Sequence, residues 1–147
     1  MKIPLKYYKI FIISVLFFTH LSHAQNNTKN DLLYSAQDSI LFDLQNNTVE
    51  LYNNAEVVYE TIKLNAGFIS IDFDKNLLFS TGIKDSLGND VEQPIFIEND
   101  KIYHADTIIY NYKSKKAKIK KLLTEEEGGY LHGKEIKKDE EKIYYLK

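Results

Sequence analysis

The stretch that decides the fold is residues 38–51, Asp38-Ser-Ile-Leu-Phe-Asp-Leu-Gln-Asn-Asn-Thr-Val-Glu-Leu51. Side chains two positions apart lie on the same face of an extended strand. Ile40 and Phe42 therefore share one face before the turn-forming Gln-Asn-Asn segment. Val49 and Leu51 share one face after it. The stretch predicts a β-hairpin with a single apolar face.

The same arrangement recurs along the chain. Residues 68–79 and 106–119 repeat it, and residues 135–146 are a weaker fourth copy. Each copy has an apolar strand, a turn that carries an acidic residue or Asn, and a second apolar strand. Because a single hairpin cannot hide its apolar face from water, stacked copies bury one continuous face. We therefore expect an all-β module of stacked antiparallel hairpins. The corresponding turn positions are Asp43, Asp72 and Asn111.

The start of the chain has the layout of a secretory signal peptide. Three lysines precede an almost entirely apolar run from Ile10 to Leu21, and small residues follow at Ser22 and Ala24. The run is twelve residues long, whereas a helix that spans a bilayer needs about 20. We expect cleavage between Ala24 and Gln25, and therefore export.

This layout predicts a signal peptide over residues 1–24, a flexible lead-in over residues 25–32 and one β-domain over residues 33–147. Cleavage leaves 123 of the 147 residues, enough for one core, and moves the formal charge from -2 to -5 by removing three lysines. That charge argues against a nucleic-acid partner. The chain has no cysteine, which excludes disulfides, thiol catalysis and thiolate metal sites.

Catalytic motifs are lacking in the sequence. Asp72 and Asp74 lie two positions apart, but they adjoin an Asp-Lys-Asn turn, and turn chemistry explains them better than a catalytic pair. His104 and His132 are the only histidines after residue 24, and they lack the spacing of a zinc site. No nucleophile elbow, phosphate loop or dinucleotide fingerprint occurs. We expect no enzyme activity, no cofactor and no metal.

An ordered series of motifs extends over the chain from Tyr34 to Lys147. The motifs are Ala36-Gln-Asp-Ser-Ile40, Leu51-Tyr-Asn-Asn-Ala-Glu-Val-Val-Tyr59, Leu64-Asn-Ala-Gly67, Ile71-Asp-Phe-Asp74, Gly82-Ile-Lys-Asp-Ser-Leu-Gly88, Tyr110-Asn-Tyr-Lys-Ser-Lys-Lys-Ala117 and Gly129-Tyr-Leu-His-Gly-Lys134. In this order they resemble the OstA-like N-terminal domain of the LPS-assembly proteins. That family holds the periplasmic bridge LptA and the periplasmic part of LptD, and the resemblance is greatest to LptD-type proteins of Bacteroidetes-like bacteria.

The resemblance implies a β-jellyroll, or β-taco, whose apolar interior carries the acyl chains of lipopolysaccharide. It implies that such modules stack by edge-strand pairing into a bridge across the periplasm. The partners would be lipopolysaccharide, other jellyroll modules of the bridge and outer-membrane assembly partners. The expected location is the periplasm, in association with the cell outer membrane, and the expected role is lipopolysaccharide transport without catalysis.

The chain departs from the LptD pattern in two respects. In LptD a large outer-membrane barrel follows the module, and 123 mature residues cannot supply both. The disulfides of some LptD proteins cannot form without cysteine. We therefore interpret the chain as the N-terminal part of an LptD-like protein. A standalone LptA-like bridge protein is the next interpretation, and a structural or adhesin β-repeat module without lipid cargo is the third.

The candidate lining of the lipid groove is the set of apolar residues that alternate along the predicted strands. The alternative is that these side chains fill a closed core. The set is Ile40, Phe42, Val49, Leu51, Val57, Tyr59, Ile69, Ile71, Phe73, Ile108, Tyr110 and Ile119.

Residues 113–121 hold six lysines in nine positions. We expect this run to be a solvated sheet edge, because lysine on an edge strand discourages unwanted pairing. The alternative is that the lysines contact lipid phosphates as point charges.

Overall fold

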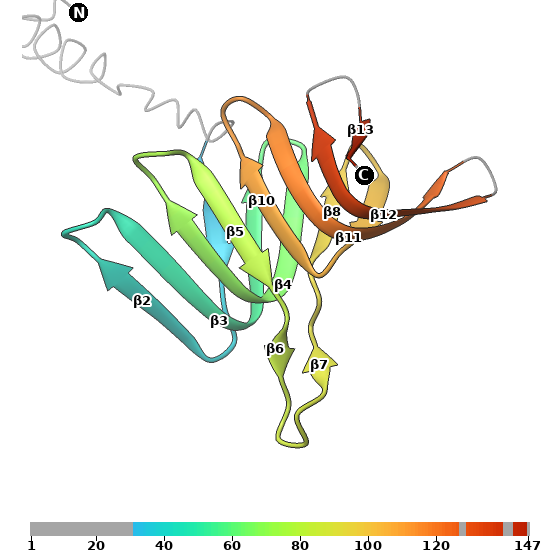
Figure 1. The fold of residues 1–147 in the computed structure, drawn as a ribbon. Helices are drawn as coiled ribbons and strands as arrows, with labels where there is room; N and C mark the ends of the chain where they lie inside the picture. Colours follow the sequence, from blue (N-terminus) through green and yellow to red (C-terminus); the bar gives the residue numbers. More distant parts are fainter. Residues whose placement is uncertain (1–30, 127–128, 140–142, 147) are drawn as a thin grey trace, which may run out of the picture.

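The computed structural model describes residues 31–126, 129–139 and 143–146, and every regular element in it is a β-strand (Figure 1). The predicted signal peptide and its cleavage site lie outside the described residues. The strands are β1 (Leu33–Ser35), β2 (Ser39–Asp43), β3 (Thr48–Tyr59), β4 (Ile62–Asp72), β5 (Leu77–Thr81), β6 (Ile83–Lys84), β7 (Asp90–Val91), β8 (Ile95–Glu98), β9 (Lys101–His104), β10 (Thr107–Asn111), β11 (Lys116–Glu126), β12 (Gly129–Lys138) and β13 (Ile143–Leu146).

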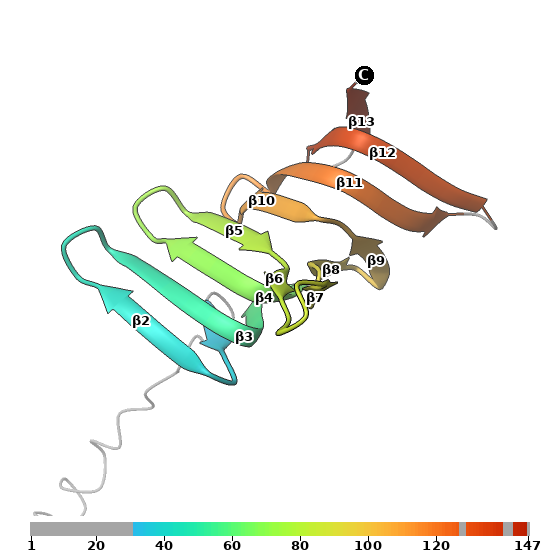
Figure 2. The same cartoon turned by 60° about the horizontal axis from the view of Figure 1, so that its bottom comes forward.

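The strands form two layers because the long strands bend and contribute one half to each. Layer 1 has the order β2-β3-β4-β5-β10-β11-β12-β13, and its strands lie side by side in Figure 2. Layer 2 contains β1, β8 and β9 together with the other halves of β3, β4 and β11. All pairs are antiparallel. The predicted all-β jellyroll of stacked hairpins is confirmed.

The bend between the layers, which we call the fold line, has local causes. Asn53 and Asn54 have φ values of 61° and 44°, and the β3–β4 register shifts beside them. In β4 the fold line passes Gly67, where a Cβ atom would lie 2.7 Å from Cγ1 of Ile83. In β11 it passes Lys121, whose φ is 50°. Left-handed Asn residues and a glycine without room for a side chain allow the strands to turn sharply.

A closed circuit of pairs surrounds the core. Each strand in the series β4, β5, β10, β11, β9 and β8 pairs with the next one, and β8 pairs with β4 to close the circuit. Both layers contribute side chains to this interior, and each fully buried one contributes about 1.5–3 kcal/mol relative to exposure. The largest fully buried side chains are Tyr110, Phe96, Leu51, Leu64, Ile69, Ile71, Leu78, Ile108, Ile119, Leu122, Ile136 and Val57.

The repeated hairpins of the sequence are β2–β3, β4–β5, β10–β11 and β12–β13. The first three close with the same turn chemistry. The Asp43 carboxylate accepts the Asn46 N–H at 3.0 Å, and the Asp72 carboxylate accepts the Lys75 N–H at 2.8 Å. The Asn111 side-chain oxygen accepts the Ser114 N–H at 2.8 Å. Asp72 therefore stabilises the turn between β4 and β5, in agreement with the sequence-based interpretation.

The lysine-rich run does not form an edge, so that expectation is wrong. β11 pairs with β10 and β9 on one side and with β12 on the other. Ala117 and Ile119 point inward and are buried, whereas Lys116, Lys118 and Lys120 are exposed on the outer face of layer 1. The lysines alternate with core residues because successive side chains of a strand point to opposite faces of the sheet.

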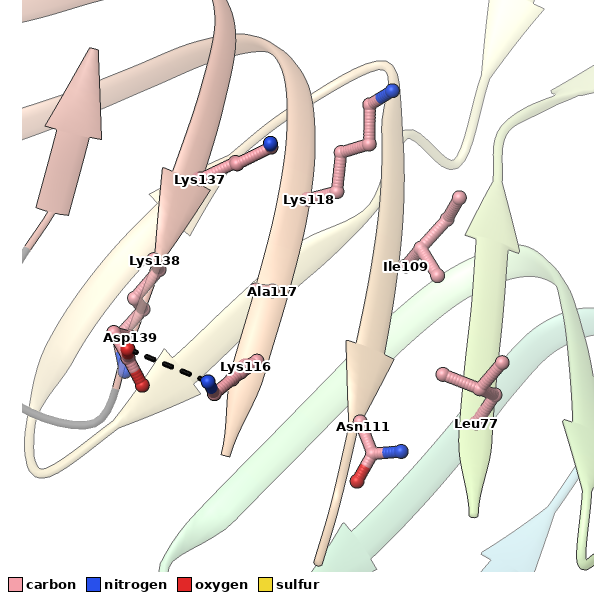
Figure 3. A pocket seen from close by; sticks show the side chains of 9 residues that line it. All are labelled: Leu77, Ile109, Asn111, Lys116, Ala117, Lys118, Lys137, Lys138 and Asp139. Atoms are coloured by element: carbon pink, nitrogen blue, oxygen red, sulfur yellow. Dashed lines mark ion pairs between the residues drawn. The ribbon is translucent and has the colours of Figure 1, made fainter. Parts of the chain in front are cut away.

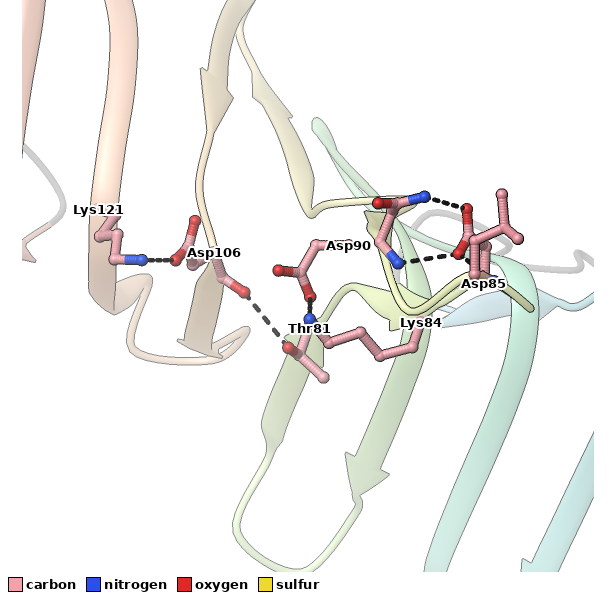
Figure 4. A network of polar contacts seen from close by, with 8 residues as sticks. Thr81, Lys84, Asp85, Asp90, Asp106 and Lys121 are labelled. Atoms are coloured by element: carbon pink, nitrogen blue, oxygen red, sulfur yellow. Dashed lines mark hydrogen bonds and ion pairs between the residues drawn. The ribbon is translucent and has the colours of Figure 1, made fainter.

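The segment between β5 and β8 carries a separate hairpin, β6–β7, which projects from the fold line (Figure 1). Lys84 and Asp90 pair across it at 2.5 Å, and the Asp85 carboxylate accepts two hydrogen bonds from Asn89 (Figure 4). Nearby, Lys121 lies 2.5 Å from Asp106. These exposed contacts order the turns at the fold line.

Candidate functional site

The register places the sequence-predicted lining residues on the inner face. In layer 1 two rows cross the strands and face layer 2. The first row is Ile40, Leu51, Ile69, Ser80, Ile108, Ile119 and Ile136, and the second is Phe42, Val49, Ile71, Leu78, Tyr110 and Ala117. Val57 and Tyr59 come from the layer 2 half of β3, and Phe73 follows β4. The structure therefore brings the candidates together between the two layers.

The degree of burial differs along this interior. Ile40, Tyr59 and Phe73 are half-buried and pack against the core. Phe42 is 60% exposed although it lies on the inner face. The interior is therefore filled by its own side chains within the closed circuit and opens at the β2 end. The candidates that are fully packed into the core are Val49, Leu51, Val57, Ile69, Ile71, Ile108, Tyr110 and Ile119.

Several inner residues were missed by the sequence analysis. Phe96 on β8 contacts Tyr110 across the layers, with ring centroids 4.9 Å apart, and Tyr103 on β9 at 6.1 Å. Leu64 and Leu78 are also fully buried. Leu64 follows the same two-residue alternation and could have been found from it. Phe96 lies in a four-residue strand after Pro94, where the alternation is too short to stand out.

The β2 end presents two strands whose outer edges have no partner among the described residues. β2 and β1 each pair only with β3. Unpaired N–H and C=O groups on such edges accept a further strand. Large apolar side chains are exposed around them, namely Leu33, Leu41, Phe42 and Leu44, with 62%, 54%, 60% and 91% of their surface exposed. At the other end of layer 1, β13 pairs only with β12 in the described part of the chain.

The two layers meet again on the side opposite the fold line, which we call the mouth. The rings of Tyr59 on layer 2 and Tyr112 on layer 1 have centroids 5.1 Å apart. Burial raises the pKa of the Tyr112 phenol, and the nearby Tyr59 and Asp72 raise it further. The two tyrosines line a cavity of about 180 Å³ together with Ile62, Tyr110 and polar residues that include Glu60, Glu98 and Lys115. The mouth therefore brings aromatic and charged side chains together.

Two ion pairs cross the mouth. Nζ of Lys138, at the end of β12, lies 2.5 Å from Oε2 of Glu98, at the end of β8. Their side chains are 7% and 13% exposed, so this pair is buried. Lys115 and Glu60, in the turns after β10 and β3, are 3.9 Å apart and more exposed. In both pairs the cation belongs to layer 1 and the carboxylate to layer 2.

A shallow groove of about 390 Å³ lies on layer 1 beside the mouth, and Figure 3 shows its lining. Ile109 and Leu77 are its apolar part, and lysines of β11 and β12 surround them. Lys118 lies 2.7 Å from Glu135 and lowers the pKa of that carboxyl, with Lys120 and Lys137 adding to the effect. The groove is basic and amphipathic, a chemistry that suits an anionic surface.

Metal-binding clusters are lacking in the part of the chain that the structure describes. No group of three or more His, Cys, Asp or Glu side chains there is placed to hold a metal ion. The Asp74 carboxylate accepts a hydrogen bond from Asn47 at 2.7 Å and thus belongs to the turns. No helix among these residues has the length and apolar character of a membrane span.

Comparison with known proteins identifies the fold. No protein-family model and no curated protein sequence matches the chain. Fifteen chains of solved structures do match. One is the crystal structure of LptH, the LptA homologous periplasmic component of the conserved lipopolysaccharide transport device from Pseudomonas aeruginosa, with a TM-score of 0.64 and 16% sequence identity over 79% of this chain and 82% of that one. The fold is therefore the LptA-like β-jellyroll.

Proposed function

We propose that the chain is a non-catalytic periplasmic module that holds the acyl chains of lipopolysaccharide between its layers and passes them towards the outer membrane. The observation that carries the proposal is the continuous apolar interior, which opens at the β2 end where Phe42 is 60% exposed on the inner face. The fold shared with LptH, a component of a lipopolysaccharide transport device, supports this role.

The physical basis is burial of hydrocarbon. Each methylene group that leaves water contributes about 0.8 kcal/mol, so a few acyl chains supply a large binding energy without any reaction. The open inner surface around Phe42 and Ile40 offers the first contact. Deeper entry requires the layers to part, because side chains such as Ile71 and Tyr110 already fill the closed circuit. The head group stays in water at the rim.

The strand edges at the two ends of layer 1 suggest how lipid could pass from one module to the next. A strand of a neighbouring jellyroll module that pairs with β2 would extend layer 1 and cover Leu41, Phe42 and Leu44. β13 offers the corresponding edge at the other end. The proposed partners are therefore other modules of the transport bridge and outer-membrane assembly partners.

The proposed context is the N-terminal part of an LptD-like protein, exported by cleavage after Ala24. The support is the motif series, which resembles LptD-type proteins most. The alternative is a standalone LptA-like bridge. The genomic sequence after Lys147 separates the two, because LptD requires an in-frame continuation into long alternating strands. N-terminal sequencing of the mature protein tests cleavage before Gln25.

One observation favours a second function. Eight of the lining candidates are packed into a core that their own side chains fill, as expected for a structural or adhesin β-repeat module without cargo. Titration of the purified mature chain with radiolabelled lipopolysaccharide distinguishes the two. We expect saturable binding that Phe42→Ser weakens severalfold and Leu41→Ser leaves unchanged, since Leu41 is similarly exposed, at 54%, but lies on the outer face. Absence of binding by the folded wild-type chain would favour the structural module.

A further inference from the structure

The buried ion pair between Lys138 and Glu98 is an unusual feature of the mouth. Lys138 is the one charged residue among the described residues that counts as buried. It lies in register with Ala117 on the inner face of layer 1, whereas Glu98 lies in register with Ile62 on layer 2. The pair therefore links the layers across an apolar interior, rather than neighbours within one sheet.

A buried ion pair of this kind adds little to the stability of the fold, but it allows the two layers to separate at a low cost in free energy. Removing two ions from water costs several kcal/mol, and their attraction often does no more than offset this cost. When the layers part, both ions regain their hydration, so opening costs less than the separation of an equally tight apolar contact. The weaker Lys115–Glu60 pair is half-exposed and opens still more easily.

The two ion pairs that cross the mouth have the same orientation. Their cations, Lys115 and Lys138, are on layer 1, and their carboxylates, Glu60 and Glu98, are on layer 2. A phosphate group that arrives at the mouth is attracted by the lysines and repelled by the carboxylates. It can therefore replace a carboxylate as the partner of a lysine while it disfavours closure of the layers.

We propose that the mouth is a phosphate-binding latch, in which Lys115 and Lys138 exchange Glu60 and Glu98 for the phosphate groups of an amphiphile whose acyl chains enter between the layers. This inference rests on the proposed function and adds the site that recognises the head group. No bond is made or broken; the lysines change partners.

The test uses the full mature chain and two probes, bisphosphorylated lipid A and the same lipid after removal of its phosphates. The quantity measured is the ratio of their affinities, in which the shared cost of opening cancels. Lys138→Met lowers this ratio about tenfold, because one charged hydrogen bond to phosphate is lost. Glu98→Gln raises it, because a competing carboxylate is removed.

The matched control is Lys63→Met. Lys63 forms a 2.6 Å ion pair with Glu56, but both residues lie on layer 2, so this variant leaves the ratio unchanged. A ratio near one for the wild type, or one that neither Lys138→Met nor Glu98→Gln alters, overturns the latch and leaves acyl-chain binding intact. Binding of neither probe by the wild type overturns the proposed function as well.

A second arm covers the case in which Lys138→Met does not fold. The chain has no cysteine, so a Tyr59→Cys/Tyr112→Cys double variant offers one thiol on each side of the mouth, and a bifunctional thiol reagent with an internal disulfide can bridge the two. The bridged variant is expected to take up bisphosphorylated lipid A poorly, and reduction of the linker is expected to restore uptake. Equal uptake by the bridged and reduced forms would overturn the latch, because uptake would not require the mouth to open.

Discussion

The side-chain amide of Asn47 donates a hydrogen bond to the Asp74 carboxylate at 2.7 Å, and so joins the turn of the first hairpin to the turn of the second. The next link has the same form, because the Asn111 amide donates to the Lys75 carbonyl oxygen at 2.9 Å. The repeats are thus tied together at their turns as well as along their strands. Neighbour-to-neighbour links of this kind are typical of repeat architectures.

The first prediction concerns Asn47, which has a φ of 50°. Asn47→Ala loses the bond to Asp74 and places alanine in a left-handed conformation that it tolerates less well than asparagine, so we expect a loss of about 1–2 kcal/mol in the free energy of unfolding. Asn47→Gly loses the bond but keeps the conformation without strain and should lose less. Urea denaturation measures both. Equal stabilities for the two variants would contradict the conformational argument.

The second prediction concerns the fold line. Gly67→Ala introduces a Cβ atom 2.7 Å from Cγ1 of Ile83, and we expect destabilisation of about 1–3 kcal/mol. Ile83→Ala removes the two nearest contacting atoms, Cγ1 and Cγ2, but leaves the backbone nitrogen of residue 83 at 3.0 Å, so the double variant should recover part of that loss. A double-mutant cycle by denaturant unfolding gives the coupling. Strict additivity would show that the contact with Ile83 is not what excludes a side chain.

The third prediction concerns the stability of the fold at low pH. Hydrogen bonds from the Lys75 side chain and backbone hold the pKa of Asp72 below its ordinary value of 3.8. The unfolded chain therefore binds more protons than the folded chain between the two pKa values, so stability is present above 3.8 and falls as the pH decreases through the folded value. Asp72→Asn should reduce the difference in urea midpoint between pH 7 and pH 3. An unchanged difference would count against this linkage.

The fourth prediction concerns the β2 edge. Lysine on an edge strand disfavours strand addition. The Leu41→Lys/Phe42→Lys variant should therefore remove concentration-dependent association of the mature chain in sedimentation velocity. Leu87→Lys is the control, since Leu87 is also exposed, at 85%, but lies in the turn between β6 and β7. Loss of association in the control alone would place the contact on that hairpin.

The sequence predicted the hairpins well because their signals are local. Two-residue alternation and Asp or Asn turns mark β2–β3, β4–β5 and β10–β11, and most lining candidates lie on the predicted face. The interpretation of residues 113–121 as an edge was wrong because β11 pairs with β10 on one side of this run and with β12 on the other, and the lysine content of a strand does not reveal whether both of its edges are paired. The cross-layer contacts could not be predicted, since they depend on the bends at Asn53 and Gly67.

The most direct test of lipid between the layers is photo-crosslinking in cells at two adjacent positions. Phe42 and Leu41 are exposed to similar extents, 60% and 54%, but face inward and outward respectively. A photoreactive residue at position 42 is predicted to capture lipopolysaccharide, and one at position 41 to capture little. Equal capture at both positions, or none at position 42 in folded and exported protein, would contradict the account.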